Sequence, residues 1–323
     1  MNKSSTIFVI LLAGLFLFAS CNKPETGNEP LPDPKPAVVE HRALPDVVNK
    51  VKTAAVIKEI TSSSTLSLTG GVQETDLTVT LTNGYKENIF IVSADLDRDS
   101  IYARVAVPTN LVVKPEGEWP RRTLTTMAYS IDLSGGLVIA MINADFWNTK
   151  TFVPRGPVHC NGHVVSSTFE PSGNKQGISF VSCSSEDKMN IDYSSSYTEA
   201  SASLPNVTGS GLMLAWDGKQ VDNSSWPADD RHPRTAIGYT KDGFVFFFCV
   251  DGRNEGVSEG MTYDEMGCIF EALGCDRAVN LDGGGSTQLL VRNPDTDKFQ
   301  IRNKPSDGTE RAVINAWVLM EKL

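Results

Sequence analysis

The stretch AVNLDGGGSTQLLV, residues Ala278–Val291, places three consecutive glycines between two apolar segments that are each typical of a buried strand. Asp282 precedes the glycines, and Ser286 and Thr287 follow them. Glycine is needed where the backbone takes a positive φ or where another group approaches the main chain closely. The run Gly283, Gly284 and Gly285 therefore predicts a turn with exposed amides, a nest of the kind that binds phosphate. The alternative is a structural turn in which Asp282 caps its own backbone.

This turn does not match two familiar glycine-rich motifs. It is not a P-loop, because no Gly-Lys-Ser/Thr follows and the next segment is typical of a strand. It is not a nucleophile elbow, because the second glycine of the G-x-S-x-G motif is missing after Ser286. None of the four histidines lies near such an elbow, which argues against a Ser-His-Asp hydrolase.

The composition indicates a globular protein without a nucleic-acid partner. The chain has 323 residues, of which 40% are hydrophobic and 21% charged, values typical of a folded domain. A net charge of -10 argues against nucleic-acid binding through overall electrostatic attraction. Any anion-binding site must therefore be local, built from a few arginines or backbone amides.

Residues 1–20 are predicted to be a signal peptide. The apolar stretch Ile7–Ala19 fits a signal sequence and is short for a membrane span. Small residues directly before Cys21 resemble a bacterial lipoprotein signal, although a plain secretory signal with an incidental cysteine is the alternative. Residues 21–36 are rich in proline and predict an extended tether. We expect lipidation of Cys21 and anchoring to a membrane of the bacterial cell envelope, on its periplasmic or outer-surface face.

Export would place the other cysteines in a compartment that permits disulfides. Their number is odd, so at least one is expected to be unpaired or to pair between chains, and their connectivity stays open. These five residues are Cys160, Cys183, Cys249, Cys268 and Cys275.

The predicted fold class is α+β, with a mixed, mainly antiparallel sheet and few helices. Short apolar runs broken by Gly, Pro, Asn and Asp fill residues 85–323, which we expect to form a single catalytic-type domain after a small lead-in region at residues 37–84. Asn83-Gly84 predicts a hairpin. One helix is predicted after Thr262, with a capping box completed by Glu265.

A second hairpin is predicted around Asp242-Gly243. A two-residue turn there would place Arg234 directly opposite Asp251. The strand FVFFFCV, Phe244–Val250, is apolar on both faces and is expected to be central. The arginine and the aspartate would then lie at the end of the sheet, where arginine suits phosphate recognition. A surface ion pair is the alternative.

Two further polar groups lie next to apolar strands. The strand in VIAMINAD runs into Asn143 and Asp145, which alternation places on one face, unless they form only an Asx turn. Arg311 leads into the last strand, where a solvated edge arginine is the alternative. Because strands of one sheet place their ends together, we expect these side chains to gather with Asp282 and the glycine turn.

Five motifs of the chain occur in a characteristic order, namely MINADFW, GPVHCNGHVV, RTAIGYTKDG, LGCDRAVNLDGGGSTQLLV and NKPSDGTERAVINAWVLM. In these motifs and their order the chain resembles the phosphodiester glycosidase domain family, over roughly residues 85–323. Ala144–Trp147 depart from the glycine and second phenylalanine of many members, which could reshape the pocket. The resemblance implies hydrolysis of a sugar-1-phosphodiester between the anomeric carbon and the phosphate. The expected partner is a phosphorylated carbohydrate, such as a cell-surface or dietary phosphoglycan.

Roles for individual residues follow from that resemblance. The transition state is oxocarbenium-like and needs a carboxylate, while arginine and amides would stabilise the departing phosphate. The predicted catalytic residues are Asp282 and Asp145 as acid/base or oxocarbenium partners, Arg234 as a phosphate ligand, and Asp251 as the residue that orients Arg234. The predicted substrate-binding residues are Asn143, Thr235, Arg253, Gly283, Gly284, Gly285, Ser286, Thr287 and Arg311.

Two alternatives stay open. Asp145, Asp251 and Asp282 are oxygen ligands suited to Mg²⁺ or Ca²⁺, so the chain could be a divalent-metal-dependent phosphodiesterase, although no cofactor is certain. The other alternative is a surface lipoprotein that binds phosphorylated glycan, or supports polysaccharide assembly, without cleavage.

Overall fold

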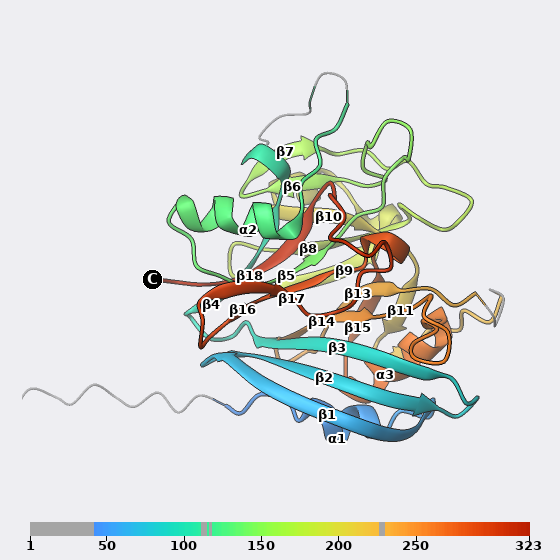
Figure 1. Cartoon of the computed structure of the whole chain (residues 1–323). Helices are drawn as coiled ribbons and strands as arrows, with labels where there is room; N and C mark the ends of the chain where they lie inside the picture. Colours follow the sequence, from blue (N-terminus) through green and yellow to red (C-terminus); the bar gives the residue numbers. More distant parts are fainter. Residues whose placement is uncertain (1–41, 111–114, 116–117, 226–229) are drawn as a thin grey trace, which may run out of the picture. The chain divides into compact units, whose positions relative to one another are not determined.

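The structure is a computed structural model that describes residues 42–110, 115, 118–225 and 230–323 (Figure 1). The predicted signal peptide, Cys21, the tether and the first residues of the lead-in region lie outside the described residues. Within the described ranges, no helix has both the length and the apolar character needed to cross a membrane. Every described strand pair is antiparallel and only three α-helices are present in these ranges, which confirms the predicted class.

The largest sheet has eight strands in the order β1-β2-β3-β14-β13-β15-β11-β12. The lead-in region supplies the first helix, α1 (Val47–Lys52), and the long edge of this sheet, seen in blue in Figure 1. The strands are β1 Ile57–Thr69, β2 Val72–Leu81, β3 Lys86–Asp95, β14 Phe244–Val250, β13 Arg234–Tyr239, β15 Arg277–Asn280, β11 Met213–Trp216 and β12 Lys219–Gln220.

Two five-stranded sheets complete the fold. One has the order β17-β16-β5-β18-β4, with β17 Lys298–Ile301, β16 Leu289–Asn293, β5 Val138–Asn143, β18 Ala316–Glu321 and β4 Ile101–Ala106. The other has the order β7-β6-β10-β8-β9, with β7 His163–Ser166, β6 Val158–Cys160, β10 Asn206–Ser210, β8 Ser179–Cys183 and β9 Met189–Tyr193. Short 3-10 helices occur at η1 Pro108–Asn110, η2 Ser194–Ser196, η3 Glu199–Ser203 and η4 Gly284–Ser286.

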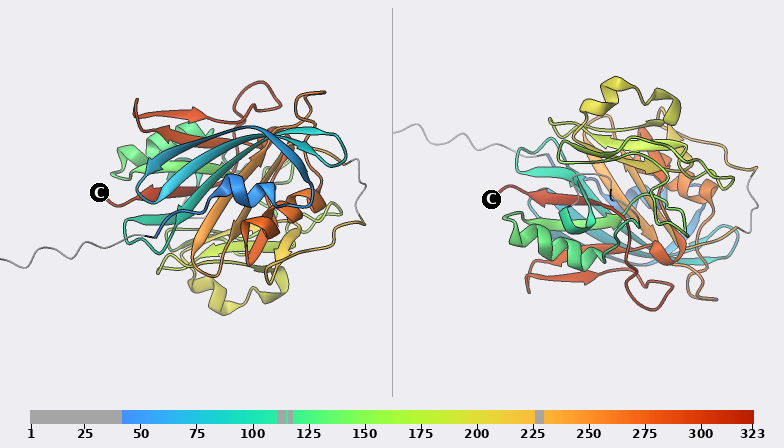
Figure 2. Two further views of the ribbon diagram at one scale, coloured as in Figure 1. Left: turned by 90° about the horizontal axis from the view of Figure 1, so that it is seen from below. Right: turned by 90° about the horizontal axis from the view of Figure 1, so that it is seen from above.

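The helices cover outer faces of the sheets. Figure 2 shows α1 beside α3 (Tyr263–Leu273) on one face of the eight-stranded sheet, and α2 (Leu124–Leu133) packs against β5. The α3 helix has the predicted capping box of Thr262 and Glu265, and it ends at Gly274 in the left-handed conformation. The predicted helix therefore forms as expected.

The strand β14 is central, as predicted, and its alternate side chains enter two different parts of the core. Phe246 and Phe248 pack in the cluster that contains α3, whereas Phe247 and Cys249 pack in the cluster between the sheets. All seven residues of the strand are buried, because β13 and β3 cover its two edges and apolar layers cover its two faces.

The register of the β13–β14 hairpin differs from the prediction. Arg234 lies opposite Val250, not opposite Asp251. The turn has three residues, because the amide of Thr240 donates to the carbonyl of Phe244 at 2.9 Å and Gly243 takes a φ of +85°. Such a turn adds one residue to the connection. The hairpin predicted at Asn83-Gly84 does form, between β2 and β3.

The five cysteines all lie among the described residues, and all are free thiols.

Candidate active site

The glycine turn lies between β15 and β16. Gly284 has a φ of +61°, and a side chain there would approach the Arg253 guanidinium to 3.0 Å. A side chain at Gly285 would overlap the Arg311 guanidinium. These two glycines are therefore explained by a left-handed backbone at one position and by close approach of an arginine at each.

The prediction that all three glycine amides are exposed to an anion is wrong. The Gly284 amide donates to the carbonyl oxygen of Pro233 at 2.8 Å, and the Gly283 amide donates to the Asp282 carboxylate. The turn continues into η4, where the Ser286 amide donates to the Gly283 carbonyl at 3.2 Å. The turn is thus tied into the fold by its own amides, and it brings arginine side chains close to its backbone.

A cavity of about 470 Å³ opens beside this turn. Five of the predicted site residues line it, namely Arg234, Arg253, Asp282, Gly283 and Gly284. The rest of the lining comes from Phe146, Asn174, Gln176, Asp230, His232 and Tyr263. The structure therefore brings a carboxylate and two arginines from distant parts of the chain to one cavity.

Asp145 lies next to the cavity but is buried. The Asp282 amide donates to the Ala144 carbonyl at 2.9 Å, which holds the two segments together. Asp145 is only 1% exposed, and its Oδ2 accepts a hydrogen bond from the Gly156 amide at 3.0 Å. A side chain at Gly209 would come within 2.6 Å of this carboxyl group, so glycine is required for it to fit.

The two carboxyl groups have different environments. Burial raises the pKa of Asp282 to about 6, while a hydrogen bond from Ser286 and the charge of Arg311 limit the rise. Burial raises the pKa of Asp145 well above its ordinary value, and the charge of Asp282 raises it further. Burial therefore favours the protonated form of Asp145, whereas Asp282, with a pKa of about 6, is ionised at neutral pH.

Arg234 is held by the protein itself. Its Nε donates to the Met261 carbonyl at 3.1 Å, Nη1 to the Tyr263 hydroxyl at 2.8 Å, and Nη2 to the Asp230 carbonyl at 2.8 Å. It is 5% exposed. Most of its donors are thus already used, which restricts how many hydrogen bonds it can give to a ligand.

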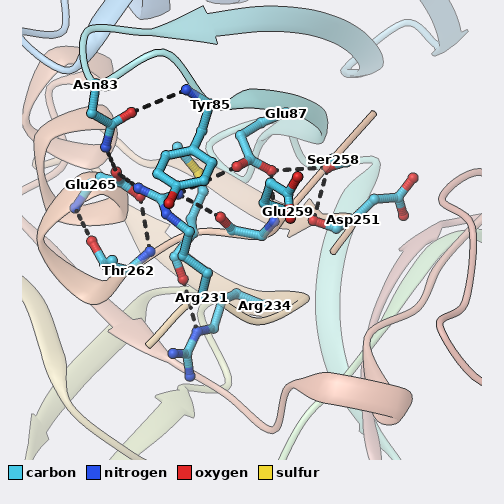
Figure 3. Close-up of polar contacts among 12 residues, drawn as sticks. Asn83, Tyr85, Glu87, Arg231, Arg234, Asp251, Ser258, Glu259, Thr262 and Glu265 are labelled. Atoms are coloured by element: carbon cyan, nitrogen blue, oxygen red, sulfur yellow. Dashed lines mark hydrogen bonds and ion pairs between the residues drawn. The ribbon is translucent and has the colours of Figure 1, made fainter. Parts of the chain in front are cut away.

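Asp251 does not orient Arg234, so that prediction is wrong. Its Oδ1 accepts a hydrogen bond from the Lys304 amide at 2.8 Å, and Asn303 provides a second bond. Figure 3 shows the Arg234 guanidinium and the Asp251 carboxyl group pointing in different directions. Because the hairpin is shifted by one residue, Asp251 lies beyond the strand and holds the segment before the last strand. Burial raises the pKa of Asp251 to about 6.

Arg253 differs from Arg234 in every respect that matters for ligand binding. It is exposed, lines the cavity beside Gly284, and donates only a long hydrogen bond of 3.5 Å to Ser306. Within the part of the chain that the structure describes, no carboxylate lies within ion-pair distance of it. Its φ of +58° is uncommon for a residue with a side chain, and such strain concentrates at functional sites.

The other predicted substrate-binding residues do not line the cavity. Thr235 and Asn143 are buried and bonded to each other at 2.8 Å, joining β13 to β5. Gly285, Ser286 and Thr287 are buried in the turn behind the cavity wall. Arg311 contacts Asp307 and the Ser286 hydroxyl. These residues support the wall, because the turn folds back into η4 and does not extend along the cavity.

The three predicted metal ligands, Asp145, Asp251 and Asp282, do not form a metal site in this structure. Across residues 42–110, 115, 118–225 and 230–323, no group of three or more His, Cys, Asp or Glu side chains is arranged to hold a metal ion.

Sequence reasoning missed Asp230, His232 and Tyr263. His232 precedes Arg234 by two residues, so alternation along an extended chain could have placed both on the same side. Tyr263 is the first residue of α3 and carries no such signal. Its place in the site depends on the packing of α3 against β13, which only the tertiary structure shows.

The segment before Arg234 is held by a buried ion cluster (Figure 3). Arg231 pairs with Glu265 and, at 3.4 Å, with Glu87, and its Nη1 donates to the Gly260 carbonyl at 2.7 Å. The Tyr85 ring lies 3.8 Å from the guanidinium carbon. Burial raises the pKa of Glu87 to about 8. The cluster joins β3, α3 and the cavity segment.

Comparison with known proteins identifies relatives of this arrangement. A family model described as phosphodiester glycosidase matches residues 136–320. The SPbeta prophage-derived uncharacterized protein YomE of Bacillus subtilis is 42% identical over 112 residues, a match that spans 34% of this chain and 16% of that protein.

Solved structures share the fold. A hypothetical protein from Synechocystis has a TM-score of 0.58 at 18% identity, covering 81% of this chain and 64% of that one. The catalytic domain of zebrafish N-acetylglucosamine-1-phosphodiester alpha-N-acetylglucosaminidase, auto-inhibited by its pro-peptide, has a TM-score of 0.58 at 16% identity, covering 81% of this chain and 88% of that one.

Proposed function

Because the chain belongs to the phosphodiester glycosidase family, we propose that it hydrolyses a sugar-1-phosphodiester between the anomeric carbon and the phosphate oxygen. The observation that carries this proposal is the cavity wall on which Asp282 lies together with Arg253 and Arg234. Cleavage of such a bond develops positive charge on the sugar and negative charge on the phosphate. A carboxylate beside arginines supplies the opposite charge at each end.

Asp282 is the group we assign to the sugar. Its pKa of about 6 leaves it ionised at neutral pH, so it can stabilise the oxocarbenium-like carbon or take a proton from water. Asp145 is buried, and its burial together with the charge of Asp282 raises its pKa and favours its protonated form. Two charges in this buried place would repel each other. We assign Asp145 as a positioning residue, because its carboxyl group accepts the Gly156 amide while the neighbouring Ala144 carbonyl accepts the Asp282 amide.

Arg253 is the residue we assign to the phosphate. Its guanidinium has no carboxylate partner among the described residues and lies where Gly284 leaves room for it. Arginine binds phosphate oxygens through two parallel hydrogen bonds, a geometry that suits a phosphodiester. Arg234 contributes positive charge to the same wall, and its bond to Tyr263 orders that wall before the substrate arrives.

The test uses a panel of sugar-1-phosphodiesters that includes UDP-N-acetylglucosamine. Mass spectrometry detects the free reducing sugar that is released from each substrate. Asp282→Asn is the test variant, and the exposed Asp295→Asn is its matched control. Release by the unmodified chain and the control but not by Asp282→Asn supports the proposal. Retained binding of phosphosugars without release from any substrate would instead identify a glycan-binding protein.

Metal dependence is tested in the same assay. We propose that the residues lining the cavity carry out the reaction without a divalent metal, and participation of Mg²⁺ or Ca²⁺ is the alternative outcome. Release that is unchanged by a chelator agrees with this proposal. Release that is lost with the chelator and restored by one cation would show that a divalent metal takes part.

We also propose that the protein is anchored in the bacterial cell envelope through a lipid on Cys21. The support is the sequence around Cys21 and the proline-rich tether that follows it. Labelling of cells with a radioactive fatty acid tests this proposal, with Cys21→Ala as the variant. Equal labelling of both chains, or labelling of neither, would contradict it.

A further inference from the structure

His232 is a titratable side chain on the cavity wall with no role in the mechanism described so far. It lines the cavity together with Asp282, Arg253 and Arg234. Its Nε2 lies 2.8 Å from Asp230 Oδ1. A carboxylate in this position accepts the Nε2 proton and fixes the ring, as it does for histidines that act in proton transfer. The other nitrogen, Nδ1, is buried and has no hydrogen-bond partner among the described residues.

The backbone of His232 is held in place on both sides. Before it, Arg231 is locked in the ion cluster with Glu87 and Glu265 (Figure 3). After it, Pro233 accepts the hydrogen bond from the Gly284 amide. The His232 carbonyl itself accepts a hydrogen bond of 3.2 Å from the Met261 amide.

Gly260 completes this packing around the histidine. A side chain at Gly260 would come within 2.4 Å of the His232 backbone, and Gly260 has a φ of +98°. A surface histidine with only a solvation role does not need such close packing. This packing fixes the backbone of His232, and the contact of Nε2 with Asp230 holds the ring, so the side chain is positioned before any substrate binds.

The surroundings of His232 lower its pKa in the free protein. Burial lowers its pKa, Arg234 and Arg253 lower it further, and Asp230 acts in the opposite direction. Asp282 and Tyr263 line the same cavity. A phosphate bound at Arg253 would neutralise the positive charge and favour the protonated ring.

We propose that His232 is a further catalytic residue, which donates a proton to the phosphate oxygen as the glycosidic bond breaks, with Asp230 as its positioning residue. This inference rests on the proposed function. The bond between the anomeric carbon and oxygen breaks, and its electron pair stays on the oxygen, which takes the proton from His232. Water adds to the anomeric carbon and gives its proton to Asp282. Solvent then returns that proton to His232, so the cycle is balanced.

The first experiment measures protonation and needs no turnover. The chain has four histidines, so His232→Gln identifies the His232 signal in a ¹H–¹⁵N spectrum of the full chain. The spectrum is recorded across pH with and without inorganic phosphate. The pKa of His232 is expected to rise by about one unit with phosphate while the other histidines stay unchanged. An unchanged His232 pKa would overturn the proposal.

The second experiment separates proton donation from a structural role. His232→Gln and its matched control, the exposed His163→Gln, are assayed on a sugar-1-phosphodiester and on the 2,4-dinitrophenyl glycoside of the same sugar, whose leaving group needs no proton. His232→Gln is expected to lose about 10²-fold on the phosphodiester, the low end of the range for general acids. It should lose less than about tenfold on the dinitrophenyl glycoside.

The outcomes distinguish this inference from the proposed function. Equal losses on both substrates, or no loss on the phosphodiester, would overturn the role of His232 while the chain is still a phosphodiester glycosidase. An unmodified chain that cleaves no phosphodiester would overturn the proposed function and this role together. Asp230→Asn should move the alkaline limb of the pH profile to lower pH, because Asp230 raises the pKa of the proton donor His232. A purely structural residue would change only the amount of folded protein.

Discussion

The backbone amide of Gly284 donates a 2.8 Å hydrogen bond to the carbonyl oxygen of Pro233, which joins the glycine turn to the start of β13. The two segments lie about fifty residues apart in the sequence, yet this bond places Asp282 beside Arg234 and His232. The turn therefore connects the two segments of the chain that line the cavity. Its glycines allow arginines to approach the backbone.

Gly284→Ala should lower activity more than stability. Its positive φ costs an alanine about 1–2 kcal/mol, and the new methyl group would also displace the Arg253 guanidinium. Gly218→Ala is the matched control, because Gly218 has a φ of +78° with open space around it. Thermal unfolding should show similar losses for both variants. Only Gly284→Ala should reduce kcat/KM, and an equal reduction in both would exclude the displacement.

Asp282→Asn should abolish activity and also make the protein more stable at alkaline pH. The folded-state pKa of Asp282, about 6, lies above the ordinary value of 3.8, so stability from this group is lost as pH rises through about 6. Asparagine does not ionise and avoids this loss. Chemical denaturation at pH 5 and pH 8 tests the difference, with Asp295→Asn as control. A variant that is less stable than the control at pH 8 would contradict the assignment.

Activity should rise with pH through about 6 on the acid side of the profile. Asp282 must lose its proton before it can stabilise positive charge on the sugar, and its pKa is about 6. The profile of kcat/KM, which reports the free protein, is the measurement to make. An acid limb near pH 4 would mean that burial does not control this carboxylate.

Arg253→Ala and Arg234→Ala should have different effects. Loss of a charge-assisted hydrogen bond to phosphate should lower kcat/KM of Arg253→Ala by about 10- to 100-fold, with little change in Tm. Arg234→Ala should lower Tm as well, because it removes three buried hydrogen bonds, to the Met261 and Asp230 carbonyls and to the Tyr263 hydroxyl. Matching Tm values for the two variants would show that the bonds of Arg234 do not stabilise the fold.

Glu87→Gln should flatten the pH dependence of stability. The Glu87 pKa is raised from 4.5 to about 8, so the free energy of unfolding should fall as pH rises across that window. Glutamine removes this titration, whereas the exposed Glu59→Gln should keep it. Denaturant unfolding between pH 5 and pH 9 gives the two slopes. Equal slopes in the variant and the control would show that Glu87 does not titrate in this range.

Local signals in the sequence predicted local structure well. The apolar run Phe244–Val250 forms a central strand, Asn83-Gly84 forms a hairpin, and Thr262 with Glu265 caps a helix. Each of these depends on residues that are neighbours in the chain. The predicted register of the β13–β14 hairpin was wrong because an Asp-Gly pair can occur in a two-residue turn or in a three-residue turn. Because of that one-residue difference, Arg234 lies opposite Val250 and not opposite Asp251.

The sequence by itself determined that polar groups follow apolar strands, and it predicted that Asp282 and Arg234 gather at one site. Only the tertiary structure decided which donors are free for a ligand. The Gly284 amide and the Arg234 guanidinium are used by Pro233, Met261 and Tyr263, and Asp145 is buried against Gly209. The physical reason is that hydrogen-bond partners and desolvation come from segments far apart in the chain, whose approach depends on how sheets and helices pack.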